Sequence, residues 1–152
     1  MEVERKFLVA GAPPDLSSHP SALIRQGYVA VVEGGDELRV RDRDGRRLVT
    51  IKHGSGLVRG EVETEISPAL FDALWELTAG RRLEKTRHLV PLGTLVAEID
   101  VFAGDLAGLV MVEVEFASAA EALAFAPPAW FGAEVTDDPR YRNQALALAG
   151  AP

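Results

Sequence analysis

The chain begins Met1-Glu2-Val3-Glu4-Arg5-Lys6-Phe7-Leu8-Val9, and this stretch decides how the rest of the sequence is interpreted. Alternate residues of a β-strand point to the same face of a sheet. Glu2, Glu4 and Lys6 therefore share one face, and Arg5 lies on the other. Glu and Lys are depleted in strands, so a charged row of this kind is unusual. Taken alone, the stretch indicates an exposed edge strand whose charges prevent aggregation.

Composition limits the class of protein. The 152 residues suit one domain over residues 1–152 with a core of its own, and 47% are hydrophobic and 26% charged. No apolar run approaches the roughly 18 residues of a membrane span, and the acidic start is not a signal peptide. We therefore expect a cytoplasmic protein with no membrane partner. The absence of cysteine excludes disulfides and thiolate metal sites. The net charge of −7 argues against a nucleic-acid partner.

Alternating residues and turn signals predict eight strands. Asp44-Gly45 is a strong hairpin signal, and most other predicted connections are also short. Consecutive strands joined by short turns pair mainly antiparallel, and eight strands are enough to close a small barrel. The predicted strands cover residues 1–9, 23–32, 37–43, 46–52, 57–66, 82–90, 94–102 and 109–117.

Three helices accompany the strands. The first has Ser67 as N-cap, and Gly80 is its C-terminal stop. The second is short and opens with a capping box at residues 118–121. The last has Asp138 as N-cap and runs to Leu148. The predicted fold is mainly β (α+β), a closed eight-stranded antiparallel β-barrel with a few flanking helices.

The charged faces of the predicted strands sort by sign. Solvated sheet faces explain each strand singly, but they would mix neutral polar residues among the charges. A barrel with an inward charged face explains the sorting, because charges withdrawn from water need partners or bound ions. The rows are Arg39, Arg41 and Arg43, then Glu61, Glu63 and Glu65, then Lys85 and Arg87, then Glu98 and Asp100, then Glu113 and Glu115.

A lumen lined by both signs suits a metal-bound polyanion. Carboxylates bind hard divalent cations such as Mg²⁺ or Mn²⁺. Arginine and lysine neutralise phosphate oxygens, arginine often through two hydrogen bonds. Together these groups are what phosphoryl transfer requires.

The motifs resemble the CYTH superfamily, also called triphosphate tunnel metalloenzymes, and most closely its short single-domain bacterial members. Glu2-Val3-Glu4-Arg5-Lys6 matches the family signature E-x-E-x-K. The resemblance covers nearly the whole chain and implies an eight-stranded antiparallel tunnel that binds triphosphate with a divalent metal. The other matching segments are residues 24–28, 38–41, 50–52, 59–63, 83–87, 98–100, 112–115 and 134–137.

The resemblance also implies roles for single residues. A tyrosine and the signature lysine of related proteins activate water, which would pair Tyr28 with Lys6. For Glu65 and Glu98, a structural ion pair is at least as good an explanation as a metal or water-orienting role. Arg142 either reaches phosphate or is an exposed helical arginine. The implied metal ligands are Glu2, Glu4, Glu113 and Glu115, with Glu61, Glu63 and Asp100 as further metal or water-orienting groups. The implied phosphate-binding residues are Lys6, Arg39, Arg41, Lys52, Arg59, Lys85 and Arg87.

The leading hypothesis for the function is a metal-dependent inorganic triphosphatase that forms pyrophosphate and phosphate. One Mg²⁺ or Mn²⁺ ion would bridge phosphate oxygens and a second would orient water, so we expect two per site. The alternatives are adenylate cyclase, thiamine triphosphatase or nucleoside triphosphatase chemistry on the same fold, or a non-catalytic polyphosphate sensor. The expected partner is a small triphosphate, and the sequence leaves the oligomeric state open, with a homodimer as one option.

Overall fold

The computed structural model describes residues 3–10, 13–33, 35–53 and 60–152. Nine antiparallel strands form one sheet in the order β5-β4-β3-β2-β6-β7-β8-β1-β9. The strands are β1 (Val3–Val9), β2 (Ser21–Val31), β3 (Glu37–Arg43), β4 (Arg46–His53), β5 (Gly60–Glu65), β6 (Arg82–Leu92), β7 (Leu95–Phe102), β8 (Val110–Phe116) and β9 (Phe131–Glu134).

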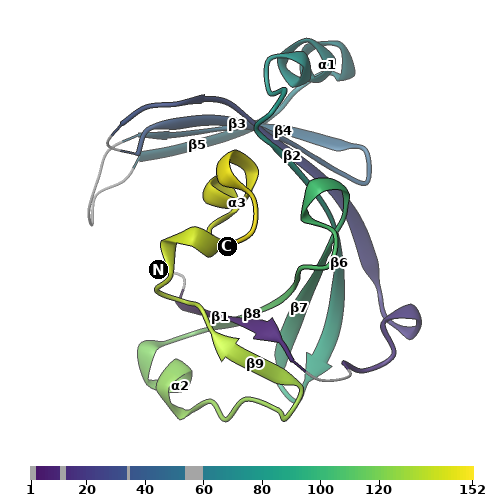
Figure 1. Cartoon of the computed structure of the whole chain (residues 1–152), viewed down its shortest axis with the longest axis vertical. Coiled ribbons are helices and arrows are strands. Elements are labelled where there is room, and N and C mark those ends of the chain that lie inside the picture. The colour runs from purple at the N-terminus through teal and green to yellow at the C-terminus, as the bar shows by residue number, and fades with distance from the viewer. Residues whose placement is uncertain (1–2, 11–12, 34, 54–59) are drawn as a thin grey trace.

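The sheet curves around a concave interior (Figure 1). Helices α1 (Pro68–Glu76) and α2 (Ala119–Ala124) lie outside the curve, and α3 (Asn143–Ala149) lies on its concave side. Short 3₁₀ turns occupy Leu16–Ser18, Gly104–Leu106 and Pro139–Tyr141. Among these described elements, no helix has the length and apolarity that crossing a membrane requires.

The predicted fold class is confirmed: the protein is mainly β, the sheet is antiparallel, and helices flank it. Two details differ. A ninth strand, β9, pairs with β1 across an irregular register, and its sequence Phe-Gly-Ala-Glu lacks the β-branched residues that signal a strand. Within the described residues the ladder also runs from β5 to β9 without joining these two end strands.

The last predicted helix is divided in two. Asp138 is an N-cap as expected, but it caps the 3₁₀ turn Pro139–Tyr141, accepting a hydrogen bond from the Arg140 backbone N–H. Arg142 then adopts an extended backbone conformation, with φ −69° and ψ 145°, before α3 begins at Asn143. The interruption turns the chain so that α3 enters the concave side of the sheet (Figure 1).

The convex face of β1, β7 and β8 carries the larger hydrophobic core. Its residues alternate with the charged rows, as the sequence pattern requires. Burying each large side chain stabilises the fold by about 1.5–3 kcal/mol, so this packing fixes which strand face turns inward. The cluster contains Phe7, Val90, Ala97, Ile99, Val112, Val114 and Phe116, covered by Ala122 of α2 and Phe131 of β9.

Helix α1 covers the convex face of the other half of the sheet. The Ser67 side chain caps it by accepting from the Leu70 backbone N–H, and Phe71 is fully buried. The Arg25 guanidinium on β2 lies over the Phe71 and Trp75 rings, at 5.5 and 5.2 Å from their centroids. These cation–π contacts hold α1 against the sheet.

The concave face is charged at one end and apolar at the other, which corrects the expectation of a lumen lined only by charge. Tyr28, Leu83, Phe102 and Met111 share this face with the charged rows and pack against Leu146 of α3. The strands therefore change from charged to apolar along their inward faces, and α3 covers the apolar end.

Candidate active site

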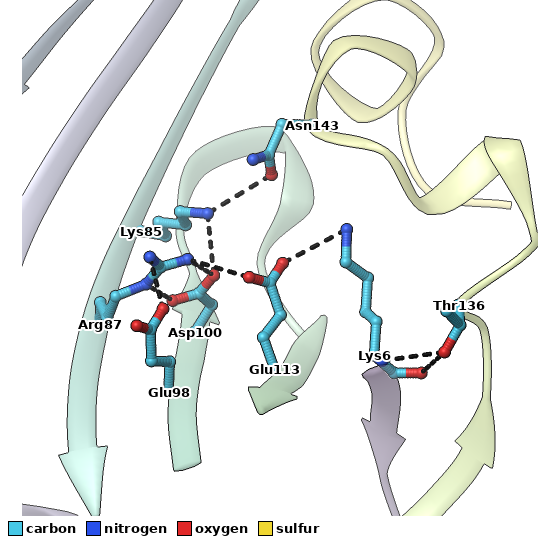
Figure 2. Close-up of polar contacts among 8 residues, drawn as sticks. All are labelled: Lys6, Lys85, Arg87, Glu98, Asp100, Glu113, Thr136 and Asn143. Carbon is cyan, nitrogen blue, oxygen red and sulfur yellow. Dashed lines mark hydrogen bonds and ion pairs between the residues drawn. The ribbon is translucent and has the colours of Figure 1, made fainter. Parts of the chain in front are cut away.

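The most buried polar cluster joins β6 and β7. Lys85 Nζ lies 2.8 Å from Asp100 Oδ2, and both side chains are only 3% exposed. Arg87 donates two parallel hydrogen bonds to Asp100, from Nε at 2.8 Å and from Nη2 at 2.9 Å. Its Nη1 also lies 2.7 Å from Glu98 Oε2, so the ion-pair alternative for Glu98 holds. Figure 2 shows these groups converging on the concave side.

Burial and charge act in opposite directions within this cluster. Burial lowers the pKa of the Lys85 ammonium, and the Asp100 charge only partly offsets it. Burial alone would raise the pKa of Asp100, but the hydrogen bonds from Arg87 and the charge of Lys85 outweigh it and lower that pKa. Asp100 is therefore an ionised carboxylate already engaged by two cations.

Glu113 on β8 connects this cluster to β1. Its Oε1 lies 3.3 Å from Lys6 Nζ and its Oε2 lies 3.7 Å from Arg87 Nη2. The Lys6 backbone is fixed in turn by the chain after β9, because its N–H donates to Thr136 Oγ1 at 3.0 Å and its carbonyl accepts from the Val135 N–H at 2.8 Å. The inward direction of the Lys6 side chain follows from this anchoring (Figure 2).

Two pairs of carboxylates stand directly opposite each other on neighbouring strands: Glu4 with Glu115, and Glu98 with Glu113. Like charges in such positions destabilise a sheet unless a cation lies between them. Burial raises the pKa of Glu98, and its acidic neighbours, Glu113 first, add to that rise while Arg87 opposes it. This donor set has the oxygen chemistry and the excess of negative charge that fit a hard divalent cation.

The donors are adjacent without converging on one point. Over the ranges that the structure describes, no group of three or more His, Asp or Glu side chains is arranged to hold a metal ion. Glu2, a predicted ligand, lies outside the described residues. Glu61 and Glu63 are exposed on β5, which Figure 1 shows across the concave interior from β1 and β8. The predicted metal ligands are thus divided between two sides of the site.

The predicted phosphate-binding arginines lie on β3. Arg39 and Arg41 face the concave side, and no carboxylate in the described part of the chain lies within 4 Å of either guanidinium. Burial lowers the pKa of Arg41, and the neighbouring cations Arg39, Arg87 and Arg43 lower it further, against Glu63. Arg39 and Arg41 therefore lie among other cations without a described carboxylate in direct contact.

Lys52 and Glu63 complete this half of the site. Lys52 on β4 stands opposite Glu37 on β3 and Glu61 on β5. The Glu63 carboxylate accepts a hydrogen bond of 2.9 Å from Thr50 Oγ1. Arg59, another predicted phosphate-binding residue, lies outside the described residues.

Tyr28 is buried to 1% exposure at the apolar end of the site. Its hydroxyl accepts a hydrogen bond of 2.9 Å from Gln26 Nε2. Burial raises the Tyr28 pKa; Arg39 opposes this rise and Glu37 adds to it. Since Tyr28 contacts Gln26 and Lys6 pairs with Glu113, the described contacts do not bring the predicted pair together, and the pair stays a prediction.

Exposure and pairing bear on two of the alternatives left open. Glu65 forms an ion pair of 2.6 Å with Arg46 at the edge of the sheet, and its side chain is 66% exposed. Arg142 is exposed where α3 begins. The same C-terminal segment reaches the site through Asn143, whose Oδ1 lies 3.4 Å from Lys85 Nζ (Figure 2).

Sequence reasoning missed one buried acid. Glu37 on β3 is in phase with Arg39 and Arg41 and is only 9% exposed. The period-2 pattern that identified the arginines applies equally to Glu37 and could have found it. Gln26 and Thr50 were missed as well, because neutral polar residues in a strand carry no comparable signal.

Comparisons with known proteins agree with this geometry. The family model described as the CYTH domain matches residues 1–127. The chain is 49% identical to an inorganic triphosphatase of Nitrosomonas europaea over 151 residues, 97% of each chain. It is 35% identical to an inorganic triphosphatase of Acetivibrio thermocellus over 148 residues, 95% of this chain and 92% of the relative.

Solved structures of similar proteins have the same fold. A crystal structure of an inorganic triphosphatase superposes with a TM-score of 0.82 at 44% identity, covering 100% of this chain and 97% of that one. A putative adenylyl cyclase from Hippeastrum, described as having a dominant triphosphatase activity, shares the fold at 17% identity and a TM-score of 0.56, covering 82% of this chain and 83% of that one. The sequence motifs, the inward charged rows and these matches lead to one conclusion: the chain belongs to the CYTH domain family.

Proposed function

We propose that this protein is a metal-dependent hydrolase that cleaves inorganic triphosphate to pyrophosphate and phosphate. One observation carries the proposal: Arg39 and Arg41 lie near Arg87 on the concave face, and no described carboxylate lies within 4 Å of either β3 guanidinium. Half-buried cations that crowd together are stabilised by an anion between them. The similar proteins of Nitrosomonas europaea and Acetivibrio thermocellus are inorganic triphosphatases, which supports inorganic triphosphate as that anion.

The arginines provide binding and charge stabilisation. Arg39 and Arg41 would donate to phosphate oxygens from β3, and Arg87 would donate from β6 on the other side of the anion. Arg87 is held by two hydrogen bonds to Asp100, so its guanidinium needs little reorganisation when negative charge develops. Fixed donors of this kind are the main source of catalysis in phosphoryl transfer.

Lys6 would contact the same anion from β1. Its ammonium lies 3.3 Å from Glu113, and its backbone is anchored by Thr136. Both contacts keep the side chain extended into the site. Tyr28 contributes a buried hydroxyl whose oxygen already accepts from Gln26, leaving its proton to donate to a phosphate oxygen or to water.

Glu4, Glu113 and Glu115 would hold a divalent cation, Mg²⁺ or Mn²⁺, together with Glu2. A bound cation of this type neutralises phosphate charge and orients water for in-line attack. The carboxylates of Glu61 and Glu63 would contribute from β5, across the anion.

A substrate panel tests the proposal. Purified protein is given inorganic triphosphate, ATP or thiamine triphosphate with Mg²⁺ or Mn²⁺, and with EDTA as the metal-free control, while phosphate, pyrophosphate and cyclic AMP are measured. We expect equal amounts of phosphate and pyrophosphate from triphosphate, only with metal. If ATP gives cyclic AMP and triphosphate is not hydrolysed, the protein is a cyclase. Tight triphosphate binding without turnover would identify a sensor, and either result would refute the proposal.

A further inference from the structure

Glu37 is a buried acid that the proposed chemistry does not use. It lies at the start of β3, faces the concave side with Arg39, and is only 9% exposed. No donor among the described residues reaches its Oε2, which is shielded from water. Leaving a buried charged acceptor without a partner costs about 1–3 kcal/mol or more, so this oxygen calls for an explanation.

A structural ion pair does not explain Glu37. Lys52 stands directly opposite on β4, but the two side chains are not within 4 Å, unlike the pairs at Asp100 and Glu113. The other near group is the Tyr28 hydroxyl, whose pKa is raised by burial first and, after the opposing effect of Arg39, by the Glu37 charge. Glu37 therefore borders the site without being neutralised in it.

The next inward residue has the complementary deficiency. The Arg39 Nε is buried and has no acceptor among the residues that the structure describes. Residues two apart on one strand lie about 6.6 Å apart, a spacing that one small group can bridge. The strand thus presents an unsatisfied acceptor and an unsatisfied donor side by side.

The free end of a phosphate chain matches this pair. A terminal phosphoryl group has a second pKa of about 6, so it readily carries a P–OH beside its negative oxygens. The P–OH can donate to Glu37 while a negative oxygen accepts from Arg39. An esterified or internal phosphoryl group has no such proton, and its oxygens would face the Glu37 carboxylate with like charge, which disfavours binding.

We propose that Glu37 is a specificity-determining residue that, with Arg39, recognises a free terminal phosphoryl group and so selects inorganic triphosphate over triphosphates that carry an organic group at that end. The inference deepens the proposed function and depends on it for the identity of the substrate. Inorganic triphosphate has two free ends, so one end can occupy the Glu37 pair while the other is cleaved. ATP has one free end, so with its γ-phosphoryl at the position of cleavage its esterified α-phosphoryl lies at the Glu37 pair and has no proton to donate there.

Substituting Glu37→Gln tests this inference, because glutamine keeps the shape and its amide can donate to an unprotonated oxygen. Wild type, E37Q and the charge-retaining E37D are compared for kcat/KM with inorganic triphosphate, inorganic tetraphosphate and ATP. We expect E37Q to shift the preference toward ATP by about tenfold or more relative to triphosphate and tetraphosphate, which both have two free ends. We expect E37D to retain most of the discrimination. The matched control is Glu65→Gln, an exposed acid paired with Arg46, which should leave every ratio unchanged.

Binding separates this inference from the proposed function. Dissociation constants for the same three compounds are measured by calorimetry in EDTA, where no metal is present. Wild type should bind triphosphate at least about tenfold more tightly than ATP, and E37Q should reduce that ratio. Wild type that binds both equally, or folded E37Q with unchanged ratios, would overturn the inference. Wild type that discriminates in binding but does not hydrolyse triphosphate would refute the proposed function and leave the role of Glu37 supported.

Discussion

Replacing Asp100 by asparagine should destabilise the fold strongly, because Asp100 neutralises two buried cations. Its side chain is 3% exposed and lies 2.8 Å from Lys85 Nζ and 2.8 Å from Arg87 Nε. Removing one partner of a buried ion pair costs about 3–5 kcal/mol. For a chain of this size each kcal/mol lowers Tm by about 2–4 °C, so the Tm of D100N should fall by about 6–20 °C.

Thermal unfolding measures the Tm and urea unfolding measures the free energy of unfolding, both followed by circular dichroism. Lys85→Met and the double variant are measured alongside D100N. Removing the Lys85 charge relieves part of the imbalance, so the double variant should lose less free energy of unfolding than the two single variants summed. Glu65→Gln serves as the exposed control and should change stability by less than about 1 kcal/mol. A loss below about 1 kcal/mol in D100N would refute the view that Asp100 balances the cluster.

The stability difference between wild type and D100N should also depend on pH. The pKa of Asp100 is lowered in the folded protein, so its contribution to stability is present above the unfolded pKa of about 3.9 and is lost as the pH falls through the folded value. The stability difference between wild type and D100N should therefore be full at pH 7 and shrink below about pH 4. A difference that stays constant down to acid pH would contradict the lowered pKa.

Three further substitutions test other parts of the account. Arg5→Ala removes a convex-face ion pair of 2.7 Å with Glu134, so urea unfolding should show a loss of about 1–2 kcal/mol while kcat/KM with triphosphate stays unchanged; lost turnover in folded protein would place Arg5 in the site. Gly27→Ala puts a Cβ 2.6 Å from Thr78 Oγ1 and should cost about 1–3 kcal/mol; unchanged Tm would contradict this packing. Arg41→Met relieves repulsion among half-buried cations, so Tm should hold or rise while the Kd for triphosphate increases at least about tenfold; unchanged affinity would remove Arg41 from the anion site.

Much of this fold could be predicted because strand periodicity assigns each residue to a face. The alternation around Lys6, Arg39 and Glu113 identified the inward charged rows, and the apolar residues between them form the convex core. Ser67 was identified as a helix cap because its chemistry is local. The partner that covers a strand face can come from a distant part of the sequence. Nothing near Tyr28 in the sequence therefore indicated that α3 would cover it.

The site was predictable in residue type and less so in arrangement. Periodicity placed Asp100 on the inward face but could not tell a metal ligand from the partner of Lys85 and Arg87, because both roles use an inward carboxylate. The break at Arg142, which directs α3 into the interior, depends on tertiary packing. Glu37 is the opposite case, because its position two residues before Arg39 on β3 already places it on the inward face.

The central claim is that triphosphate binds on the concave face between the arginines of β3 and Arg87 of β6. A crystal structure of the protein with triphosphate and Mn²⁺ tests it most directly, because anomalous scattering locates the metal independently of the phosphate density. The account predicts phosphate density within hydrogen-bond distance of Arg39, Arg41 and Arg87, with Mn²⁺ bound by Glu113 or Glu115. Phosphate and metal bound elsewhere, with the concave arginines contacting neither, would contradict it.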